Sequence, residues 1–501
     1  GYSRHVRVVY SAGVNLFSHC VLTASDQAQA DAFSSLLARR IRAGLYPREI
    51  SFHVYPDPPG RVGSGAGTLW ALHRLYEEIG FDPIHDADSA GAPSVLVLHA
   101  AGESRRLPVF APEGKLFAPV PVASSSTIPP VVLDLQLALY LRFPWEPGRV
   151  VVGSGDVIID FDTDSLTDLA APITGFSTPA SLEQGSRHGV FRFDAELHHL
   201  EDYYQKQPAD FLAQNAVIEG TDSCALDIGI VAMNPEYVGR CFGLAHAALA
   251  SGATVLDEIA AGRLRFGLYL EQLSASLRTV DRDEYHRRLD GVSSLAAADR
   301  DLFYDHLHDL PLGGHLARKC TFLHFGSLRE YPLAAARLAE SGLKPFYSLF
   351  DSEELPPVRR DMASALRGQG ELELPQGFCL DARTTPRGEV VAVYHEADSF
   401  RPAPRAELRF CGTLLTDWLA ARGLALEDVL GGAGLPGGVA PELAPAATVD
   451  LYDLQLFPID PAPELLAGYA SLPADPNGWA ERFRAGARVS LRWLNANTDV
   501  R

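Results

Sequence analysis

Apolar residues in about the first third of the chain follow two different spacings, and the alternation of these spacings predicts an α/β fold. Short, nearly continuous apolar runs at residues 20–23, 52–55 and 94–99 are typical of buried strands. Residues 27–44 and 130–143 instead repeat apolar side chains every three or four positions, which indicates helices. Strands that alternate with helices form a mostly parallel sheet with helices on both faces. We therefore expect a Rossmann-like domain.

Three further apolar runs extend this pattern and locate the expected binding edge. They cover residues 6–10, 149–152 and 157–161, and the second of them leads into Gly155-Asp156. In a parallel sheet, ligands bind at the carboxyl ends of the strands. The loop after His99 and the turn that holds Asp156 are therefore the first places to look for functional residues.

The pattern changes after about residue 335, which predicts a second region. Residues 353–375 are charged and contain proline, residues 376–412 look β-rich, and residues 431–446 form a Gly/Pro-rich connector. We divide the chain into an α/β domain (1–335), a β-rich domain (336–460) and a peripheral helical tail (461–501). A degenerate parallel β-helix is an alternative for the β-rich domain, although its hexapeptide period is not visible.

Composition narrows the class of protein. The 501 residues are 47% apolar and 21% charged, which is typical of globular proteins, and the formal net charge is -20. Such an acidic chain argues against nucleic acid or an anionic membrane as the main partner. An anionic substrate would then require a local cluster of basic residues.

Cysteine usage and hydropathy indicate the compartment. The six cysteines are widely spaced and form no CxxC pair, so neither a disulfide framework nor a zinc site is indicated. No signal peptide and no run of about 20 apolar residues is visible. We expect a cytoplasmic protein without a transmembrane helix.

The loop after His99 has the residues that a triphosphate site needs. Ala101, Gly102, Glu103 and Ser104 are followed by Arg105 and Arg106, and Lys115 comes after a Pro-bracketed segment. Small residues let backbone N–H groups approach phosphate oxygens, while arginines grip these oxygens in pairs. Lys115 would reach the phosphate at which charge shifts during a displacement. The alternative is an ordinary βα turn with solvated arginines.

A second glycine-rich loop precedes the first one in the chain. Gly65-Ala66-Gly67-Thr68 follows a predicted strand and opens a predicted helix, which is the context in which such loops bind nucleotides. The same glycines would also suit close packing of the helix against its neighbours.

Carboxylates and histidines complete the set of candidates. Asp156 follows a predicted strand end, where it could hold Mg²⁺, and Asp227 is a second candidate metal ligand. His188 precedes Gly189, and His324 precedes a turn of small residues. Each of these histidines could equally serve a local hydrogen bond.

Taken together, these motifs resemble the fucose pyrophosphorylase family, which includes L-fucose-1-phosphate guanylyltransferases and the guanylyltransferase half of bifunctional fucokinase/pyrophosphorylases. The resemblance covers nearly the whole chain, and the segments around Arg105 and Lys115 are its most specific part. It is carried by residues 57–72, 98–122, 155–162, 187–194, 226–234 and 322–331, and more loosely by residues 391–400, 410–419 and 451–459.

The resemblance implies both a reaction and a set of roles. Family members join GTP and L-fucose 1-phosphate, giving GDP-L-fucose and pyrophosphate, on a nucleotidyltransferase domain followed by a β-helix-like part. It makes Arg105, Lys115 and Asp156 catalytic, with Mg²⁺ on Asp156 and Asp227. The nucleotide would contact residues 65–68, 101–104 and 106, and the sugar phosphate would contact His188, Gly189, Asp227 and His324.

Three departures from the family pattern keep other functions open. The family has two glycines where this chain has Ala101-Gly102, and a methyl group there requires a negative φ at Ala101. Ser327 replaces a threonine and Glu271 an aspartate. The alternatives are the same reaction with another nucleotide or sugar phosphate, and an inactive regulatory subunit that binds nucleotide sugars. A sugar kinase is disfavoured, because no second phosphate loop follows residue 335.

Overall fold

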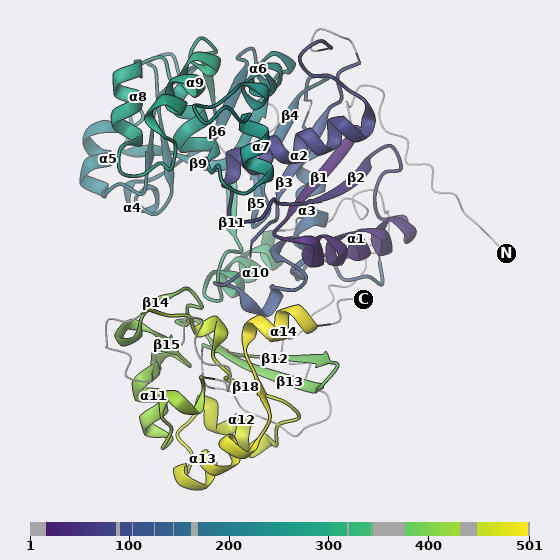
Figure 1. Cartoon of the computed structure of the whole chain (residues 1–501), viewed down its shortest axis with the longest axis vertical. Helices are drawn as coiled ribbons and strands as arrows, with labels where there is room; N and C mark the ends of the chain where they lie inside the picture. The colour runs from purple at the N-terminus through teal and green to yellow at the C-terminus, as the bar shows by residue number, and fades with distance from the viewer. Residues whose placement is uncertain are drawn as a thin grey trace, which may run out of the picture. The chain divides into compact units, whose positions relative to one another are not determined.

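The computed structural model describes residues 17–86, 91–102, 104–124, 126–143, 145–161, 169–317, 320–341, 343, 375, 377–430 and 448–498. The chain folds as two compact units (Figure 1). Unit 1 holds the described residues up to Gly102 and those from 126 to Leu323. Unit 2 holds those from 104 to Ser124 and from His324 onward. The predicted strand at 6–10 and the predicted segments 353–374 and 431–446 lie outside the described residues.

Unit 1 is built on one mixed sheet with the strand order β10-β6-β9-β4-β3-β1-β2, to which β7 and β8 are added beside β9. β2, β1, β3 and β4 are parallel neighbours, whereas β9 runs antiparallel between β4 and β6. This confirms the predicted α/β fold with a mostly parallel sheet. The strands are β1 (His19–Ala24), β2 (Ser51–Pro56), β3 (Val95–His99), β4 (Val150–Ser154), β6 (Ile173–Ser181), β7 (Gly189–Phe193), β8 (Leu200–Gln205), β9 (Ser223–Met233) and β10 (Leu312–Leu316).

The central strands are buried on both faces, which explains why their sequences read as continuous apolar runs. Successive side chains of a strand point to opposite faces, and Val95, Leu96, Val97 and Leu98 of β3 are all fully buried. The run at residues 157–161 forms β5 (Val157–Phe161), which leaves the main sheet and pairs with β11 (Cys320–His324).

Helices cover this sheet, and local signals set their ends. Asp26 accepts a hydrogen bond from the N–H of Gln29 (2.8 Å) at the start of α1, and Gly80 ends α2 in the left-handed conformation (φ +70°). Helix α2 packs on β1, β2 and β3 (Figure 1). The helices are α1 (Gln27–Arg42), α2 (Ser64–Ile79), α3 (Val132–Tyr140), α4 (Leu182–Gly185), α5 (Ala209–Asn215), α6 (Pro235–His246), α7 (Val255–Ala260), the π-helix η4 (Leu268–Leu273), α8 (Arg282–Leu289) and α9 (Ala297–Leu307).

The strand order creates a topological switch point between β1 and β3. From β1 the chain passes to β2 on one side, and it then returns to β3 on the other side. The loops that leave the carboxyl ends of β1 and β3 therefore diverge and leave a crevice at this edge. The switch point puts the expected ligand site beside Ala24 and His99.

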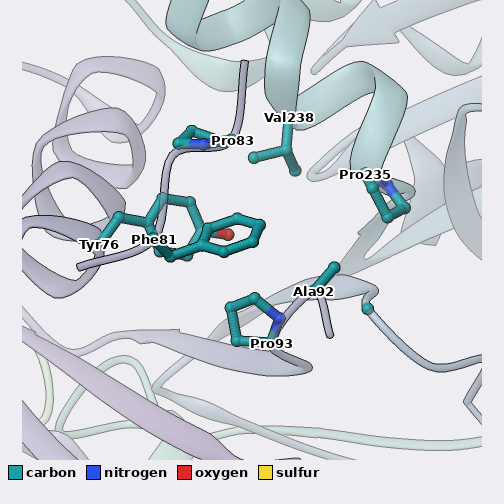
Figure 2. Close-up of a pocket in the computed structure, with 8 residues that line it drawn as sticks. Tyr76, Phe81, Pro83, Ala92, Pro93, Pro235 and Val238 are labelled. Atoms are coloured by element: carbon teal, nitrogen blue, oxygen red, sulfur yellow. The ribbon is translucent and has the colours of Figure 1, made fainter. Parts of the chain in front are cut away.

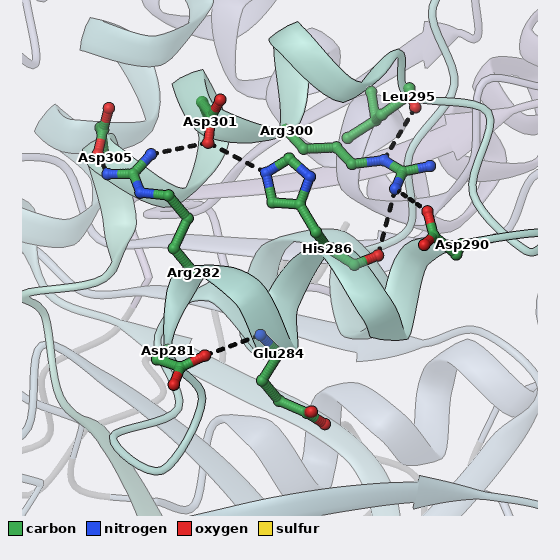
Figure 3. Close-up of polar contacts among 9 residues, drawn as sticks. All are labelled: Asp281, Arg282, Glu284, His286, Asp290, Leu295, Arg300, Asp301 and Asp305. Atoms are coloured by element: carbon green, nitrogen blue, oxygen red, sulfur yellow. Dashed lines mark hydrogen bonds and ion pairs between the residues drawn. The ribbon is translucent and has the colours of Figure 1, made fainter.

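Ion pairs connect helices α8 and α9 of unit 1 (Figure 3). Arg282 of α8 binds Asp301 (2.8 Å) and Asp305 of α9. Arg300 of α9 binds Asp290, just after α8, and donates to the carbonyl of Leu295 (3.1 Å). This helical layer is thus tied together by charge, and none of its paired arginines is a sequence-predicted site residue.

A small apolar hollow lies at the amino-terminal ends of β3 and β4 (Figure 2). Its wall includes Ala92 and Pro93, which precede β3, and Gly148, which precedes β4. The remaining lining residues are Tyr76, Phe81, Pro83, Pro235 and Val238. It contains no charged side chain, so it does not suit a phosphorylated ligand.

Unit 2 consists of small antiparallel sheets rather than a β-helix. The described strands β12 (Phe378–Thr385) and β13 (Gly388–His395) form a hairpin, and each further pair joins strands of two residues. A parallel β-helix requires stacked parallel strands, and every strand pair described in unit 2 is antiparallel. The β-helix is therefore not found in the described part. The short strands are β14 (Ala403–Pro404), β15 (Arg409–Phe410), β16 (Thr413–Leu414), β17 (Thr448–Val449), β18 (Phe457–Pro458) and β19 (Arg488–Val489).

The C-terminal tail belongs to the core of unit 2 instead of its periphery. Trp479 and Phe483 are fully buried and pack on Trp418 and Tyr469. Its helices are α12 (Pro463–Ala470), α13 (Pro476–Ala485) and α14 (Leu491–Asn497), while α10 (Glu330–Ser341), α11 (Leu415–Ala421) and the short helices η1 (Pro108–Phe110), η2 (Lys115–Phe117), η7 (Arg405–Glu407), η8 (Leu426–Asp428) and η9 (Leu451–Asp453) complete the unit. Within the described residues, no helix has the length and apolarity needed to cross a membrane.

Candidate functional site

The loop after β3 closes over the switch point and is anchored to β1. The N–H groups of Ala100 and Ala101 both donate to Oγ1 of Thr23, at 3.2 and 3.3 Å. Gln29 at the start of α1 donates to the carbonyl of Gly102 (3.2 Å). The predicted phosphate-binding N–H of Ala101 is therefore directed at Thr23 in this structure.

Backbone conformation explains the departure at Ala101. Gly102 has φ +133°, which side chains rarely tolerate, whereas Ala101 is not among the residues with positive φ. The methyl group of Ala101 is thus accepted because φ is not positive at this residue. Ser104 has φ +48°, so the turn continues in a conformation that is rare for residues other than glycine.

The second glycine-rich loop forms the first turn of α2, and its two glycines serve different purposes. A Cβ added to Gly65 would lie only 2.7 Å from the Phe266 ring, so Gly65 permits close packing. A Cβ added to Gly67 would lie 3.5 Å from Oδ1 of Asp57 and 3.8 Å from the His99 ring, which are ordinary contacts. Gly67 therefore faces the carboxyl edge of the sheet, and Gly65 faces away from it.

Thr68 connects this turn to β3. Its hydroxyl lies 2.7 Å from Nε2 of His99 and 2.8 Å from the carbonyl of Ser64. Burial lowers the pKa of His99 to about 4 and raises the pKa of Asp57 to about 6. Titratable groups with perturbed pKa values thus gather where a ligand is expected. Ala66, which the sequence predicts to contact the nucleotide, is buried, and its N–H donates to the carbonyl of Phe266 (3.2 Å).

Strands β4 and β9 bring the two predicted metal ligands to the same end of the sheet. Their antiparallel register pairs Gly153 with Ile230, so residues whose numbers sum to 383 are opposite one another. Asp156 and Asp227 satisfy this sum, although β4 ends two residues before Asp156. Ser154 at the end of β4 donates to Oδ1 of Asp156 (2.9 Å). Both carboxylates therefore lie just beyond the last pair of the β4–β9 register, at the same end of the sheet, which the sequence could not establish.

Hydrogen bonds from neighbouring residues hold one carboxylate oxygen of Asp227, and none of the described residues donates to the other. Oδ1 accepts hydrogen bonds from the N–H of Gly229 (2.8 Å) and from the hydroxyl of Tyr269 (3.2 Å). None of the described residues donates to Oδ2. Burial raises the pKa of Asp227 to about 6, while these two hydrogen bonds oppose the increase. Oδ2 is thus a suitable acceptor for a metal ion or a ligand hydroxyl.

Two tyrosines that the sequence analysis did not select connect Asp227 to Gly189. The rings of Tyr203 and Tyr269 are stacked, with centroids 4.9 Å apart and planes inclined by 23°. A Cβ added to Gly189 would lie 2.3 Å from the hydroxyl oxygen of Tyr203, so Gly189 makes room for this ring. No motif marks Tyr203, whereas Tyr269 belongs to the Tyr-Leu-Glu segment in which Glu271 departs from the family pattern.

The π-helix η4 joins these tyrosines to the first turn of α2. Its first N–H, from Leu268, donates to the hydroxyl of Ser64 (3.0 Å), and the next residue is Tyr269. Glu271 is buried and accepts from the N–H of Gly267 (2.7 Å) and the hydroxyl of Ser293 (2.7 Å), so its role is to shape this helix. Single π-helical turns are rare and frequently occur at functional sites.

His188 lies at the start of β7 and packs against β11. Its ring meets the ring of Phe322 edge-on, with centroids 5.8 Å apart. Its carbonyl accepts a hydrogen bond from the N–H of Lys206 (2.9 Å), which closes the β7–β8 hairpin. These contacts agree with the alternative, local role that the sequence left open for this residue.

Arg105 belongs to unit 2, where a carboxylate and an aromatic ring hold it. Its Nη1 donates to both oxygens of Asp450 (2.8 and 2.7 Å) and to the carbonyl of Phe400 (3.0 Å). The guanidinium also lies over the ring of Tyr452, 4.4 Å from its centroid. The positive charge that the sequence assigns to phosphate binding is thus compensated within unit 2.

Lys115 begins the short helix η2 in the same unit. It follows Gly114, which has φ +69° and turns the chain sharply. Upstream, the carbonyl of Pro108 accepts from Arg383 (2.7 Å), which also binds Asp381 (2.7 Å). Residues of β12 therefore hold the segment between Arg105 and Lys115 in place.

His324 and Arg106 surround one carboxylate of unit 2. Nδ1 of His324 lies 3.1 Å from Oε1 of Glu330, and the hydroxyl of Ser327 donates to Oε2 (2.8 Å). These groups, together with Arg106, lower the pKa of Glu330 to about 2. Ser327 caps α10 through the N–H of Glu330 (3.3 Å), a function that threonine also performs. Glu103 lies outside the described residues.

Candidate metal ligands are few among the described residues. They contain no group of three or more His, Cys, Asp or Glu side chains arranged to hold one. Asp156 and Asp227 supply two carboxylates, and Mg²⁺ commonly takes one or two together with substrate phosphates. All six cysteines are free thiols.

Comparison with known proteins agrees with these features. The family model described as the fucose pyrophosphorylase domain matches residues 88–339. The chain is similar to a bifunctional fucokinase/GDP-fucose pyrophosphorylase of Arabidopsis thaliana (28% identity, covering 66% of this chain and 32% of the relative). It is also similar to the mouse fucose-1-phosphate guanylyltransferase (30%, covering 37% and 31%) and to an L-fucokinase/L-fucose-1-P guanylyltransferase of Bacteroides fragilis (25%, covering 75% and 41%).

These matches span about a third of the length of the curated relatives, and up to 41% of the bacterial one. The family match covers half of the present chain and includes Lys115, Asp156 and Asp227. The chain therefore belongs to the fucose pyrophosphorylase family.

Proposed function

We propose that this protein transfers GMP from GTP to L-fucose 1-phosphate, producing GDP-L-fucose and pyrophosphate. The observation that carries the proposal is the pairing of β4 with β9, which brings Asp156 and Asp227 to the same end of the sheet. The names of the relatives, which are fucose-1-phosphate guanylyltransferases and bifunctional pyrophosphorylases, support the choice of sugar.

The reaction needs alignment and charge neutralisation more than proton transfer. An oxygen of the sugar phosphate attacks the α-phosphorus of GTP, and the bond to the pyrophosphate oxygen breaks. The attacking phosphate already carries most of its charge near neutral pH, since its second pKa is about 6. No general base is therefore required, and the rate depends on holding the two phosphates in line.

Each chain residue then has a defined task. Asp156 and Asp227 would hold Mg²⁺, which would supply positive charge that offsets the charge of the phosphates. Lys115 would stabilise the charge that develops at the α-phosphate, and Arg105 and Arg106 would bind the departing pyrophosphate. Gly67 and Thr68 would hold the nucleoside against the first turn of α2.

The acidic composition is compatible with these anionic substrates, because only the few basic residues proposed to contact the phosphates need to offset the substrate charge. We place the enzyme in the cytoplasm, where nucleoside triphosphates are available and its six free cysteines remain reduced. Nucleic acid and membranes are not part of the proposal.

A panel of nucleoside triphosphates and sugar 1-phosphates, read by pyrophosphate release, tests the function directly. GTP with L-fucose 1-phosphate should have the highest kcat/KM of all pairs, and chelation of divalent cations should abolish turnover. A better pair would refute the substrates but keep the reaction class. Pyrophosphate release from no pair would indicate the inactive regulatory subunit instead.

A further inference from the structure

The stacked pair Tyr203–Tyr269 is the feature of unit 1 that the proposed reaction does not yet use. Both rings are only half-buried, unlike the apolar core below them. They come from separate elements, Tyr203 from β8 and Tyr269 from η4, and they meet beside Asp227. A partly exposed aromatic pair next to a carboxylate has the composition of a carbohydrate site, with an apolar surface and an adjacent hydrogen-bond acceptor.

Contacts with neighbouring residues hold the two tyrosine rings in place. Gly189 cannot carry a side chain, because a Cβ would collide with the ring of Tyr203. Phe191 supports both rings, with centroids 5.2 Å from Tyr203 and 6.4 Å from Tyr269. On the other side, η4 is fixed to the first turn of α2 by the bond between Leu268 and Ser64 (3.0 Å). The pair is thus rigid, which favours binding by preorganisation.

Accordingly, we propose that Tyr203 and Tyr269 form the wall against which the sugar ring of the substrate lies, and that the hydroxyl of Tyr269 positions Asp227 for the sugar end of the substrate. This inference rests on the proposed function and names two specificity-determining residues for it. The hydrogen bonds from Gly229 and Tyr269 to Oδ1 fix the orientation of the Asp227 carboxylate. They leave Oδ2 as the oxygen to which none of the described residues donates.

The chemistry of a 6-deoxy sugar fits such a wall. Its C6 methyl group and one face of the ring are apolar, so they gain free energy when they cover an aromatic surface. A sugar with a hydroxyl at C6 would bring that polar group against the apolar faces of the rings, which do not replace the hydrogen bonds that it makes with water. The wall should therefore favour L-fucose 1-phosphate over L-galactose 1-phosphate, which differs from it by one hydroxyl group.

Adjacent residues of β8 provide a matched control. Tyr204 points to the opposite face of the strand, where its ring meets Phe211 at 5.3 Å. The variants are Tyr203→Leu, which removes the wall, Tyr269→Phe, which removes only the hydroxyl, and Tyr204→Leu as the control. Thermal unfolding of each variant establishes that it is folded.

The first experiment measures KM for both substrates, together with the preference for L-fucose 1-phosphate over L-galactose 1-phosphate. Tyr203→Leu and Tyr269→Phe should each raise KM for L-fucose 1-phosphate about fivefold or more, while KM for GTP stays within about twofold. Tyr203→Leu should also reduce the preference between the two sugars. Tyr204→Leu should change neither quantity. A purely structural role would lower the unfolding temperature and leave the ratio of the two KM values unchanged.

A second experiment separates this inference from the proposed function. Calorimetric titration of the full chain with L-fucose 1-phosphate and with GDP-L-fucose needs no turnover. Weaker binding by the two wall variants, and not by Tyr204→Leu, supports the wall even if no pyrophosphate is released in the panel. Equal affinity of the wild type and the wall variants overturns the inference while leaving an active wild-type enzyme intact. If the folded wild type binds neither compound, the inference is also overturned.

Discussion

The hydroxyl of Thr68 lies 2.7 Å from Nε2 of His99, and this contact joins the first turn of α2 to the end of β3. The same hydroxyl is 2.8 Å from the carbonyl of Ser64, to which it must give its only proton. The Thr68 oxygen therefore accepts from His99, which fixes the Nε2–H tautomer of a neutral imidazole. A neutral His99 agrees with its lowered pKa of about 4.

Replacement of Thr68 by valine keeps the shape and removes the acceptor for the His99 N–H. We expect Thr68→Val to lower the free energy of unfolding by about 1–2 kcal/mol, because a buried N–H is left without a partner. KM for GTP should rise, since α2 loses its connection to β3. Urea unfolding and steady-state kinetics measure the two effects. Thr68→Ser retains the hydroxyl and should behave like the wild type. If Thr68→Val also equals the wild type in both assays, Thr68 does not have the role of acceptor for the His99 N–H.

The two glycines of the first turn of α2 predict opposite outcomes for the same substitution. Gly65→Ala should destabilise the fold by about 1–3 kcal/mol, because the new methyl group overlaps the Phe266 ring. Gly67→Ala meets only ordinary contacts, and alanine favours a helix, so the stability should be kept or increased. If Gly67 faces the nucleotide, Gly67→Ala should leave the stability intact and raise KM for GTP, because the new methyl group occupies space that the nucleotide needs. Thermal unfolding and kinetics of the two variants, compared side by side, decide the assignment.

The ion pair between Arg105 and Asp450 predicts that unit 2 holds the segment that we propose binds phosphate. Asp450→Asn should loosen residues 104–110 and destabilise unit 2 by about 2 kcal/mol, because the half-buried Arg105 loses its carboxylate. Hydrogen exchange of this segment measures the change. Asp453→Asn is the control, since Asp453 pairs with the exposed Arg492 and an exposed pair contributes at most about 1 kcal/mol. Equal exchange in the two variants would show that Asp450 does not hold the segment.

Lys115 is the residue whose removal should affect the chemical step most directly. Lys115→Ala should lower kcat at least about tenfold with an unchanged unfolding temperature, because one positive charge near the reacting phosphate is lost. Lys115→Arg keeps the charge and should retain part of the activity. Turnover by the alanine variant at the wild-type rate would remove Lys115 from the mechanism.

Much of unit 1 could be predicted from sequence because its strands are buried on both faces and its helices are capped locally. The runs at Cys20 and Val95 and the periodic helix after Asp26 are signals of this kind, and they place the loop after His99 at the binding edge. The pairing of β4 with β9, which brings Asp156 and Asp227 to the same end of the sheet, could not be predicted. It depends on register between strands about 70 residues apart, and local spacing contains no information about it.

Other parts of the site were hidden for different physical reasons. Gly65 and Gly67 belong to one motif, yet only tertiary neighbours show which of them supports packing. Tyr203 is marked by no pattern, since a half-buried tyrosine on a strand is common, and its importance comes from Gly189 and Tyr269. The sequence left a β-helix open as an alternative for the β-rich part of unit 2, because a strand sequence does not state the direction of its partner.

The last prediction concerns acid stability and follows from two buried histidines. Burial lowers the pKa of both His99 and His315 to about 4, from 6.5 in the unfolded chain. As the pH falls from about 6.5 to about 4, the unfolded chain therefore binds protons that the folded chain does not, and stability decreases over this window. Each histidine should contribute a loss on the order of 1–3 kcal/mol.

Replacement of His315 by phenylalanine isolates one of these contributions. The ring of His315 packs on Phe161 and Phe176, at centroid distances of 6.0 and 5.2 Å, so an aromatic replacement keeps the packing and removes the titration. Urea unfolding at pH 7, 6 and 5 should show a shallower decline for His315→Phe than for the wild type. Between pH 8 and 9 the two proteins should have parallel stabilities, because a histidine with a pKa of 6.5 or below is almost wholly deprotonated there in both states. Identical slopes below pH 6.5 would mean that His315 is protonated as readily in the folded chain as in the unfolded one.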